Sequence, residues 1–216
     1  MPAIGQHIGH EREEQVTVET AIALIGFAFV MSITPGPSNF LLLASGANFG
    51  FVRSLPLAMG ISTGFLTMVF CVGLGLGKIL EQNPAIYNLL RIGCGVYVLW
   101  LAWQIARSRS LGAGKGNELA QPIGFIQAAM FQWVNPKAWA VALIVTVSYT
   151  RPGNFLSSLV SLIALFAVVN LPSISVWALS GAALRQSLSK GRRIAVFNLT
   201  MALLLVASMI PVLLST

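Results

Sequence analysis

The chain has 216 residues, of which 56% are hydrophobic and only 9% are charged, and its mean hydropathy is +0.81. A soluble domain carries about 25% charged residues, so this composition excludes an ordinary soluble protein and indicates a protein embedded in a lipid bilayer. The net charge of +7 does not indicate nucleic-acid binding, because the basic residues lie in connectors between apolar runs and form no stripe with interleaved aromatic residues.

A polar tail, residues 1–20, opens the chain and contains His7, His10 and most of the acidic residues. A signal peptide would need a basic start followed directly by a short apolar core, which is missing here. We expect a solvated tail, and we predict no metal site from its two histidines.

Six apolar runs follow, each long enough to cross a bilayer as a helix of about 20 residues. The fold class expected is therefore an all-α membrane protein with six transmembrane helices, which cover residues 21–48, 55–77, 85–106, 123–149, 155–183 and 194–214. Between the third and fourth runs, residues 107–122 are expected to form a flexible linker, because they contain three closely spaced glycines. Both cysteines, Cys71 and Cys94, fall inside these runs and are expected to be small buried residues, not a disulfide.

Basic residues are unevenly divided between alternate connectors. Connectors on the richer side contain Arg53, Arg107, Arg109, Lys115, Arg185, Lys190, Arg192 and Arg193, and those on the other side contain Arg12, Lys78, Arg91 and Arg151. Positively charged connectors remain in the cytoplasm, so both termini are predicted to be periplasmic.

Two proline motifs interrupt these runs. Thr34-Pro35-Gly36-Pro37-Ser38-Asn39 lies about 22 Å into the first run, and Asn135-Pro136-Lys137 lies at matching depth in the fourth. Lipid cannot satisfy unwound backbone, so such breaks persist only inside protein or along a polar cavity. Paired breaks in two halves of a chain are typical of a transporter binding site. Asn170-Leu171-Pro172 predicts a further interruption in the fifth run.

The breaks predict an inverted repeat. Residues 21–106 and 123–216 would form three-helix repeats, and because three is an odd number the second enters from the opposite side of the membrane. The predicted hinge residues are Pro35, Gly36, Pro37, Pro136 and Pro172. Gly46-x-x-x-Gly50, Gly60-x-x-x-Gly64 and Gly73-x-x-x-Gly77 predict close helix contacts, and they leave open whether the chain forms a homo-oligomer.

Helix N-termini bind anions, so the half-helices that begin near Ser38-Asn39 and after Pro136 are predicted to bind an amino-acid carboxylate. Lys137 is the basic residue nearest the centre of a run, and its partner is either that carboxylate or backbone carbonyls freed by the first break. The predicted substrate-binding residues are Ser38, Asn39, Gln132, Asn135, Lys137 and Asn170. Each amide either binds substrate or caps unwound backbone, and the two interpretations remain open.

Several other residues carry weaker expectations. Trp133 and Trp139 flank Lys137 and are expected to shape a cavity, whereas Arg91 is expected to extend to the membrane interface. No carboxylate lies deep in any run, which argues against a cationic substrate and leaves energy coupling without an assigned residue. The sequence contains no catalytic set and no phosphate-binding glycine loop, so neither an enzyme nor a cofactor is predicted.

From the first apolar run to the C-terminus, the chain resembles the LysE/RhtB family of amino-acid exporters. The resemblance rests on Thr34-Pro35-Gly36-Pro37, Leu41-Leu42-Leu43-Ala44-Ser45, Gly60-Ile61-Ser62-Thr63-Gly64-Phe65, Gly95-Val96-Tyr97-Val98-Leu99-Trp100-Leu101-Ala102-Trp103 and Asn135-Pro136-Lys137. It implies a bacterial inner-membrane carrier that exports amino acids, driven by protons, with site or hinge roles for Asn39, Asn135, Pro136 and Lys137.

Within this family the chain looks most similar to the branch that exports cysteine and O-acetylserine. The similarity is carried by Leu99-Trp100-Leu101-Ala102-Trp103, Gln132-Trp133-Val134-Asn135 and Trp177-Ala178-Leu179-Ser180-Gly181. That branch usually has two asparagines after the second proline of the motif, and here Ser38 takes the place of the first. Homoserine and threonine therefore stay in the predicted substrate class beside cysteine and O-acetylserine. The alternatives are a metal-ion exporter of the same superfamily and a membrane sensor or scaffold that transports nothing.

Overall fold

The computed structural model describes residues 19–107, 121–150, 152–189, 192–208 and 210. Helices joined by short turns make up these residues, and no strand occurs among them, which confirms the all-α class. The polar tail with His7 and His10, most of the linker and Arg151 lie outside the described residues, as does the side chain of Arg91.

The described part of each predicted apolar run is mainly helical, and two of the runs contain a break where the prolines predict it. In chain order the helices are Glu19–Ile33, α2 (Pro37–Phe49), α3 (Phe51–Cys71), α4 (Gly77–Gln82), α5 (Pro84–Arg107), α6 (Phe125–Trp133), α7 (Pro136–Tyr149), α8 (Phe155–Leu188) and α9 (Arg193–Ala207). A π-helical segment, Val72–Leu76, joins α3 to α4, and a 3-10 turn, Pro152–Asn154, precedes α8.

Among the described residues, two helical stretches are long and apolar enough to cross a membrane alone: Phe51–Leu76 and Phe155–Leu188. A third is obtained if Glu19–Ile33 and α2 count as one span, since these two helices meet at an angle of 57°. The structure thus contains two or three candidate spans by length and composition.

The two predicted breaks share one local design. Pro37 is the first residue of α2 and Pro136 the first of α7, and proline suits this position because its fixed φ fits a helix and its missing N–H would be unpaired anyway. The preceding residues, Gly36 and Asn135, have extended backbone and end the helical path. Both apolar runs therefore continue as new helices that begin inside the protein.

The predicted interruption at Asn170-Leu171-Pro172 is wrong. Helix α8 continues from Phe155 to Leu188 with Pro172 inside it. In the turn that follows, the Ser173 hydroxyl donates to the Val169 carbonyl oxygen at 2.7 Å and the Ser175 hydroxyl donates to that of Leu171 at 2.7 Å. Side-chain bonds of this kind let a membrane helix continue through a proline.

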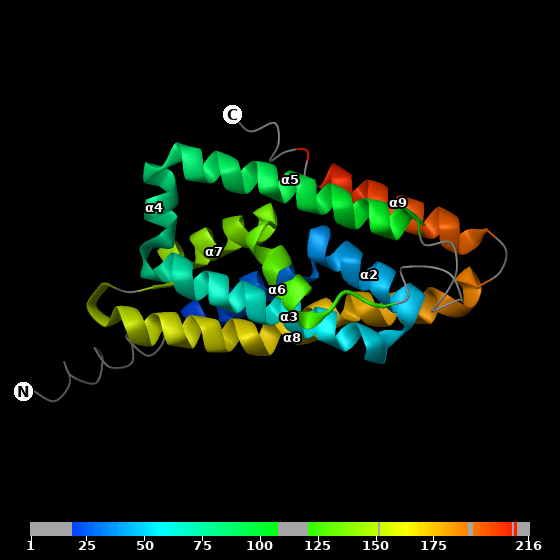
Figure 1. Cartoon of the computed structure of the whole chain (residues 1–216). Coiled ribbons are helices and arrows are strands. Elements are labelled where there is room, and N and C mark those ends of the chain that lie inside the picture. The colour runs from blue at the N-terminus through cyan, green and yellow to red at the C-terminus, as the bar shows by residue number, and fades with distance from the viewer. Residues whose placement is uncertain (1–18, 108–120, 151, 190–191, 209, 211–216) are drawn as a thin grey trace, which may run out of the picture.

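A bend that the sequence did not predict lies at Gly75. This residue has φ +108°, a backbone conformation that residues other than glycine rarely adopt, and it falls within the π-helical segment. Helix α4 consequently turns away from the axis of α3 (Figure 1). The predicted second run is helical up to this point and then changes direction.

Glycine contacts set the spacing between helices from different halves of the chain. A Cβ atom on Gly46 of α2 would overlap the Ala178 carbonyl oxygen of α8, and one on Gly181 would overlap the Leu43 carbonyl oxygen of α2. Gly60 and Gly64 make the same kind of contact with the backbone of α6, as their spacing predicts.

The other glycine pairs differ from the prediction. Gly50 has φ +85° and forms the turn between α2 and α3, so it is not a helix-contact residue. Gly73 and Gly77 lie against the side chains of Leu159 and Leu143, not against backbone.

Two apolar clusters lie on either side of a polar layer. One cluster, which we call the arginine-end cluster after the arginines described in the next paragraph, includes Leu41, Leu57, Phe131, Ile174 and Leu205. The opposite-end cluster includes Leu24, Met68, Val141, Leu159 and Phe166. In α8 the two clusters are separated by Asn170, and in the fourth run by Asn135.

One end of the bundle carries the arginines whose side chains the structure describes. The end of α5, the end of α8 and the starts of α3 and α9 all meet there (Figure 1), and these segments contain Arg107, Arg185, Arg53 and Arg193. The Arg107 guanidinium lies over the Trp103 ring, 4.6 Å from its centroid. We call this the arginine end.

Candidate functional site

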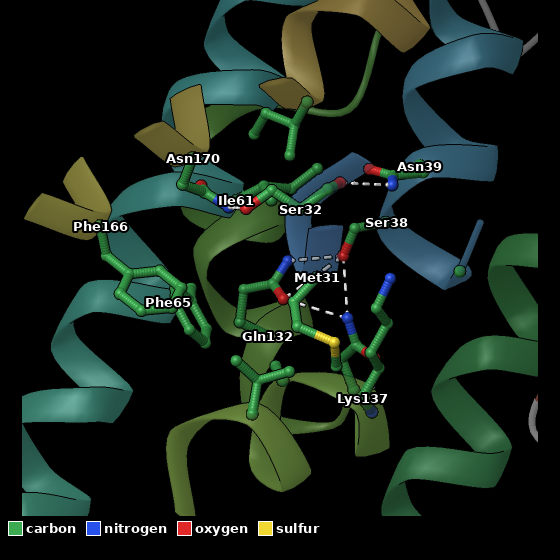
Figure 2. Close-up of a pocket in the computed structure, with 15 residues that line it drawn as sticks. Met31, Ser32, Ser38, Asn39, Ile61, Phe65, Gln132, Lys137, Phe166 and Asn170 are labelled. Carbon is green, nitrogen blue, oxygen red and sulfur yellow. Dashed lines mark hydrogen bonds between the residues drawn. The ribbon is translucent and has the colours of Figure 1, made fainter. Parts of the chain in front are cut away.

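One cavity of about 50 Å³ lies in the polar layer and is large enough to admit water. All six residues predicted to bind substrate line it, namely Ser38, Asn39, Gln132, Asn135, Lys137 and Asn170. They come from both breaks and from the middle of α8 (Figure 2). The remaining lining is mostly apolar and includes Ile61, Phe65, Phe166 and Ile174.

Ser38 links the two breaks. Its hydroxyl oxygen accepts a hydrogen bond from Gln132 Nε2 at 2.9 Å and another from Asn135 Nδ2 at 2.8 Å, and Asn135 Nδ2 also donates to Gln132 Oε1 at 3.1 Å. Figure 2 shows the Ser38 hydroxyl at the centre of this network. The short Ser38 hydroxyl thus accepts both amides at once and joins the two breaks.

The two half-helix N-termini differ in their capping. Asn135 Oδ1 accepts from the Lys137 backbone N–H at 3.1 Å, so α7 is capped by its own sequence. Gly36 has no side chain to cap α2, whose first backbone bond runs from Phe40 N to Gly36 O at 3.0 Å. The N–H groups of Ser38 and Asn39 precede that bond and have no partner within the helix. The N-terminus of α2, whose residues Gly36, Ser38 and Asn39 line the cavity, thus has no side-chain cap.

Lys137 crosses from the second break to the first. Its Nζ donates to the Thr34 carbonyl oxygen at 2.7 Å, and the side chain passes over Gly36, where an added Cβ would lie 2.9 Å from Lys137 Cδ. The ammonium group has three N–H donors, and this carbonyl accepts one of them. Lys137 therefore joins the breaks and still has donors for a ligand at the α2 N-terminus.

Side chains satisfy the carbonyls that the first break releases. Asn39 Nδ2 donates to the Ser32 and Thr34 carbonyl oxygens, each at 2.8 Å, and Trp177 Nε1 donates to that of Ile33 at 3.1 Å. Of the two predicted interpretations for Asn39, its amide nitrogen takes the capping one here.

Asn170 and Ser32 form a pair on the other side of the cavity. Asn170 Nδ2 donates to the Ser32 hydroxyl oxygen at 2.9 Å, while Asn170 Oδ1 is buried and has no hydrogen-bond partner among the described residues. Phe65 and Phe166 lie beside this pair, with ring centroids 5.4 Å apart. In Figure 2, Asn170 and Phe166 lie across the view from Lys137.

Trp133 and Trp139 do not line the cavity, contrary to expectation. Trp139 Nε1 donates to the Trp133 carbonyl oxygen at 2.8 Å, and the two rings meet edge to face with centroids 6.2 Å apart. Their side chains support the break from the α7 side. Ser32, Phe65 and Phe166 line the cavity instead, and neither composition nor spacing distinguishes them from other residues of apolar runs.

The cavity presents donors on one side and an acceptor on the other. Lys137 is the one charged residue among those that line it. Within the described chain, no group of three or more His, Cys, Asp or Glu side chains is placed to hold a metal ion.

Comparisons with known proteins identify the family of the chain. A family model described as "LysE type translocator" matches residues 29–214. The chain is 31% identical to the "Cysteine/O-acetylserine efflux protein" of Salmonella typhimurium (strain LT2) over 183 residues, which cover 83% of this chain and 90% of the relative. For the protein of the same name from Escherichia coli (strain K12), the identity is 32% over the same coverage.

No solved structure matches the chain. The predicted resemblance, including the branch of the family, is confirmed by these similarities. Because the family consists of translocators, the expectation that the chain is not an enzyme is confirmed as well. The chain belongs to the LysE family of translocators.

Proposed function

We propose that this protein is a secondary transporter that exports small neutral amino acids or their derivatives across the bacterial inner membrane. The relatives named above are efflux proteins for cysteine and O-acetylserine, and this pair heads the proposed substrate class, followed by homoserine and threonine. The observation that carries the proposal is the uncapped N-terminus of α2, which faces a polar cavity together with Lys137.

The substrate carboxylate would lie at that N-terminus. Backbone N–H groups of Ser38 and Asn39 favour negative charge there, and the Lys137 ammonium group adds a charged donor. Gln132 and Asn135 hold the Ser38 side chain between the breaks and face the same ligand. A lining with one cation and no carboxylate suits a ligand that carries a carboxylate and disfavours lysine or arginine, whose net positive charge it would repel.

The proposed topology has six spans in a 3+3 inverted repeat, residues 21–106 and 123–216, joined by a cytoplasmic linker at 107–122. Two helix pairs support it: α3 contacts α8, and α5 contacts α9. An inverted repeat maps each of these pairs onto itself. The arginine end would face the cytoplasm and both termini the periplasm.

Alternating access would hinge at the breaks, at Pro35, Gly36, Pro37 and Pro136. We also propose a hinge at Pro172, where α8 is continuous but lacks one backbone N–H donor. Protons are the proposed coupling ion. No described carboxylate reaches the cavity, so coupling would act through a group other than a buried acid.

Export from proteoliposomes tests the function directly. Vesicles that contain the full chain would be loaded with labelled cysteine, O-acetylserine, homoserine, threonine, leucine or lysine, with and without a pH gradient. We expect gradient-dependent loss of at least one small neutral compound and retention of lysine. If folded protein released none of these compounds, the transport proposal would be abandoned in favour of a sensor or scaffold.

Lys137→Met tests the site within the same assay. We expect it to slow efflux by about ten-fold, the effect of losing roughly 1.4 kcal/mol of binding. Arg193→Met removes a positive charge at the arginine end, outside the cavity lining, and should leave efflux unchanged. Equal efflux by both variants at equal expression would remove Lys137 from the site.

A further inference from the structure

Asn170 contains the one buried side-chain polar atom that lacks a hydrogen-bond partner among the described residues. The residue is only 7% exposed, and its Oδ1 atom is the orphan, because Nδ2 already donates to Ser32. Buried amides are paired with few exceptions, so such an atom in a cavity wall calls for a missing donor. Asn170 lines the cavity, so a ligand bound there can supply the donor once a small shift of the side chain uncovers Oδ1, which is covered in this structure.

The surroundings indicate what kind of donor. Phe166 precedes Asn170 by one helical turn on α8 and packs against Phe65, and both rings line the same cavity as Asn170. A carbonyl oxygen next to aromatic rings suits an ammonium group, which donates to the oxygen and is attracted by the ring faces. No carboxylate lines the cavity to compete for that group.

The opposite side of the cavity has the complementary character. Lys137 and the α2 N-terminus offer donors and positive charge there, whereas Asn170 Oδ1 offers an acceptor across from them (Figure 2). An amino acid carries its anionic and cationic groups on one carbon atom, so a site with two such sides orients it.

We propose that Asn170 Oδ1 is the acceptor for the amino group of the transported amino acid and determines specificity for α-amino acids over plain carboxylic acids. The inference rests on the proposed function and adds to its site the group that binds the substrate's amino group, opposite the carboxylate-binding side. A neutral amide suits an exporter, because it recognises the ammonium group without holding it as tightly as a carboxylate would.

The test compares two probes that differ only in the amino group, L-cysteine and 3-mercaptopropionate. Binding to the purified full chain would be measured by titration calorimetry under reducing conditions. We expect the parent to bind cysteine at least about ten-fold more tightly than 3-mercaptopropionate, as one charge-assisted hydrogen bond allows. Asn170→Leu should bring this ratio close to one by weakening cysteine alone.

Two further variants separate specificity from folding. Asn170→Asp keeps the shape and adds negative charge, so it should bind cysteine at least as tightly as the parent and 3-mercaptopropionate less tightly. Gln132→Leu removes an amide from the Ser38 side of the same cavity and should weaken both probes by a similar factor. Asn170→Ala replaces Asn170→Leu if the latter does not yield folded protein.

The outcomes are distinct. An unchanged ratio in Asn170→Leu or Asn170→Ala would overturn the assignment while leaving the transporter proposal intact. Weaker cysteine binding by Asn170→Asp would also overturn it, because the amide nitrogen would then be the group that faces substrate. A parent that binds neither probe, and exports no amino acid from vesicles, would reject both proposals.

Discussion

Asn39 and Asn135 lie beside the two breaks, and their amide groups satisfy opposite ends of the unwound backbone. Asn39 donates to carbonyls at the end of the helix Glu19–Ile33, whereas Asn135 accepts from an N–H at the start of α7. Each backbone end would otherwise lie unpaired at a depth where lipid offers no partner. The amides are therefore part of what permits breaks in these helices.

Asn39→Ala should lower the stability of the folded protein. The Thr34 carbonyl keeps Lys137 as a donor, but the buried Ser32 carbonyl loses the bond that Asn39 supplies, and an unpaired buried group costs about 1–3 kcal/mol. We expect the melting temperature in detergent to fall by several degrees. Asn83→Ala is the matched control, because Asn83 Nδ2 donates to the Ile79 carbonyl at an exposed site.

The same pair of variants distinguishes capping from substrate binding. If Asn39→Ala had the same melting temperature as Asn83→Ala and the parent but bound substrate poorly, Asn39 would contact the ligand and the capping account would be wrong.

At the level of elements, the tightest backbone approaches join helices from different proposed repeats. Helix α2 lies against α8 through Gly46 and Gly181, and α3 lies against α6 through Gly60 and Gly64. The hydrophobic effect does not hold helices together within lipid. Close approaches of this kind therefore stabilise a bundle through van der Waals packing and weak polar contacts. A transport motion in which residues 21–106 rocked rigidly against 123–216 would have to separate them. We therefore expect α2 to move with α8.

Gly46→Ala tests the α2–α8 contact. Alanine should stabilise an ordinary helix position by about 1 kcal/mol relative to glycine. At Gly46, however, the new methyl group overlaps the Ala178 carbonyl, and overpacking of this kind costs about 1–3 kcal/mol. We expect a lower melting temperature and less folded protein after detergent extraction.

Gly26→Ala is the control for that experiment. Gly26 is also inside an apolar helix, but an added Cβ would meet nothing within 4 Å. Its melting temperature should stay equal or rise. A rise of similar size in both variants would mean that α2 and α8 do not meet as closely as the structure has them.

The sequence predicts these elements unevenly, for physical reasons. Pro37 and Pro136 each follow a residue in extended conformation, so the prolines mark real breaks. Pro172 has the same chemistry, but α8 continues because serine hydroxyls hydrogen-bond to nearby carbonyls, and one sequence motif cannot reveal that compensation. Gly75 bends the chain because its φ is positive, and the apolar residues around it in the sequence do not predict that value.

The candidate site shows the same division. Paired breaks and a central lysine predict where the polar layer lies, because lipid tolerates neither feature without a partner. Which amide caps backbone and which faces the cavity depends on side-chain directions across helices far apart in sequence. Ser32 is the clearest case, since its role follows only from its contact with Asn170.

At the scale of the whole molecule, the cavity lies between two closed apolar clusters. The proposed export would require the arginine-end cluster and the opposite-end cluster to open in turn, never together, or the membrane would leak. A second cavity of about 50 Å³ lies towards the arginine end and is lined by Leu41, Ser45, Asn48 and Gln104. Leu41 is one helical turn from Ser38 on α2, so it stands between the two cavities.

Thiol labelling tests whether the clusters open in turn. In a background with Cys71 and Cys94 replaced by alanine, Ser45→Cys would report opening at the arginine end and Ala142→Cys opening at the other. Both native residues are buried, with exposures of 5% and 0%. Reaction with a charged methanethiosulfonate should therefore be slow in each, and saturating substrate should change the two rates in opposite directions, because one conformation grows at the expense of the other.

Ser187→Cys is the control, because it lies at an exposed position near the end of α8 and should react quickly whether or not substrate is present. Rates at Ser45→Cys and Ala142→Cys that rose together would point to a channel or to loosened packing, and alternating access about the proline breaks would be rejected.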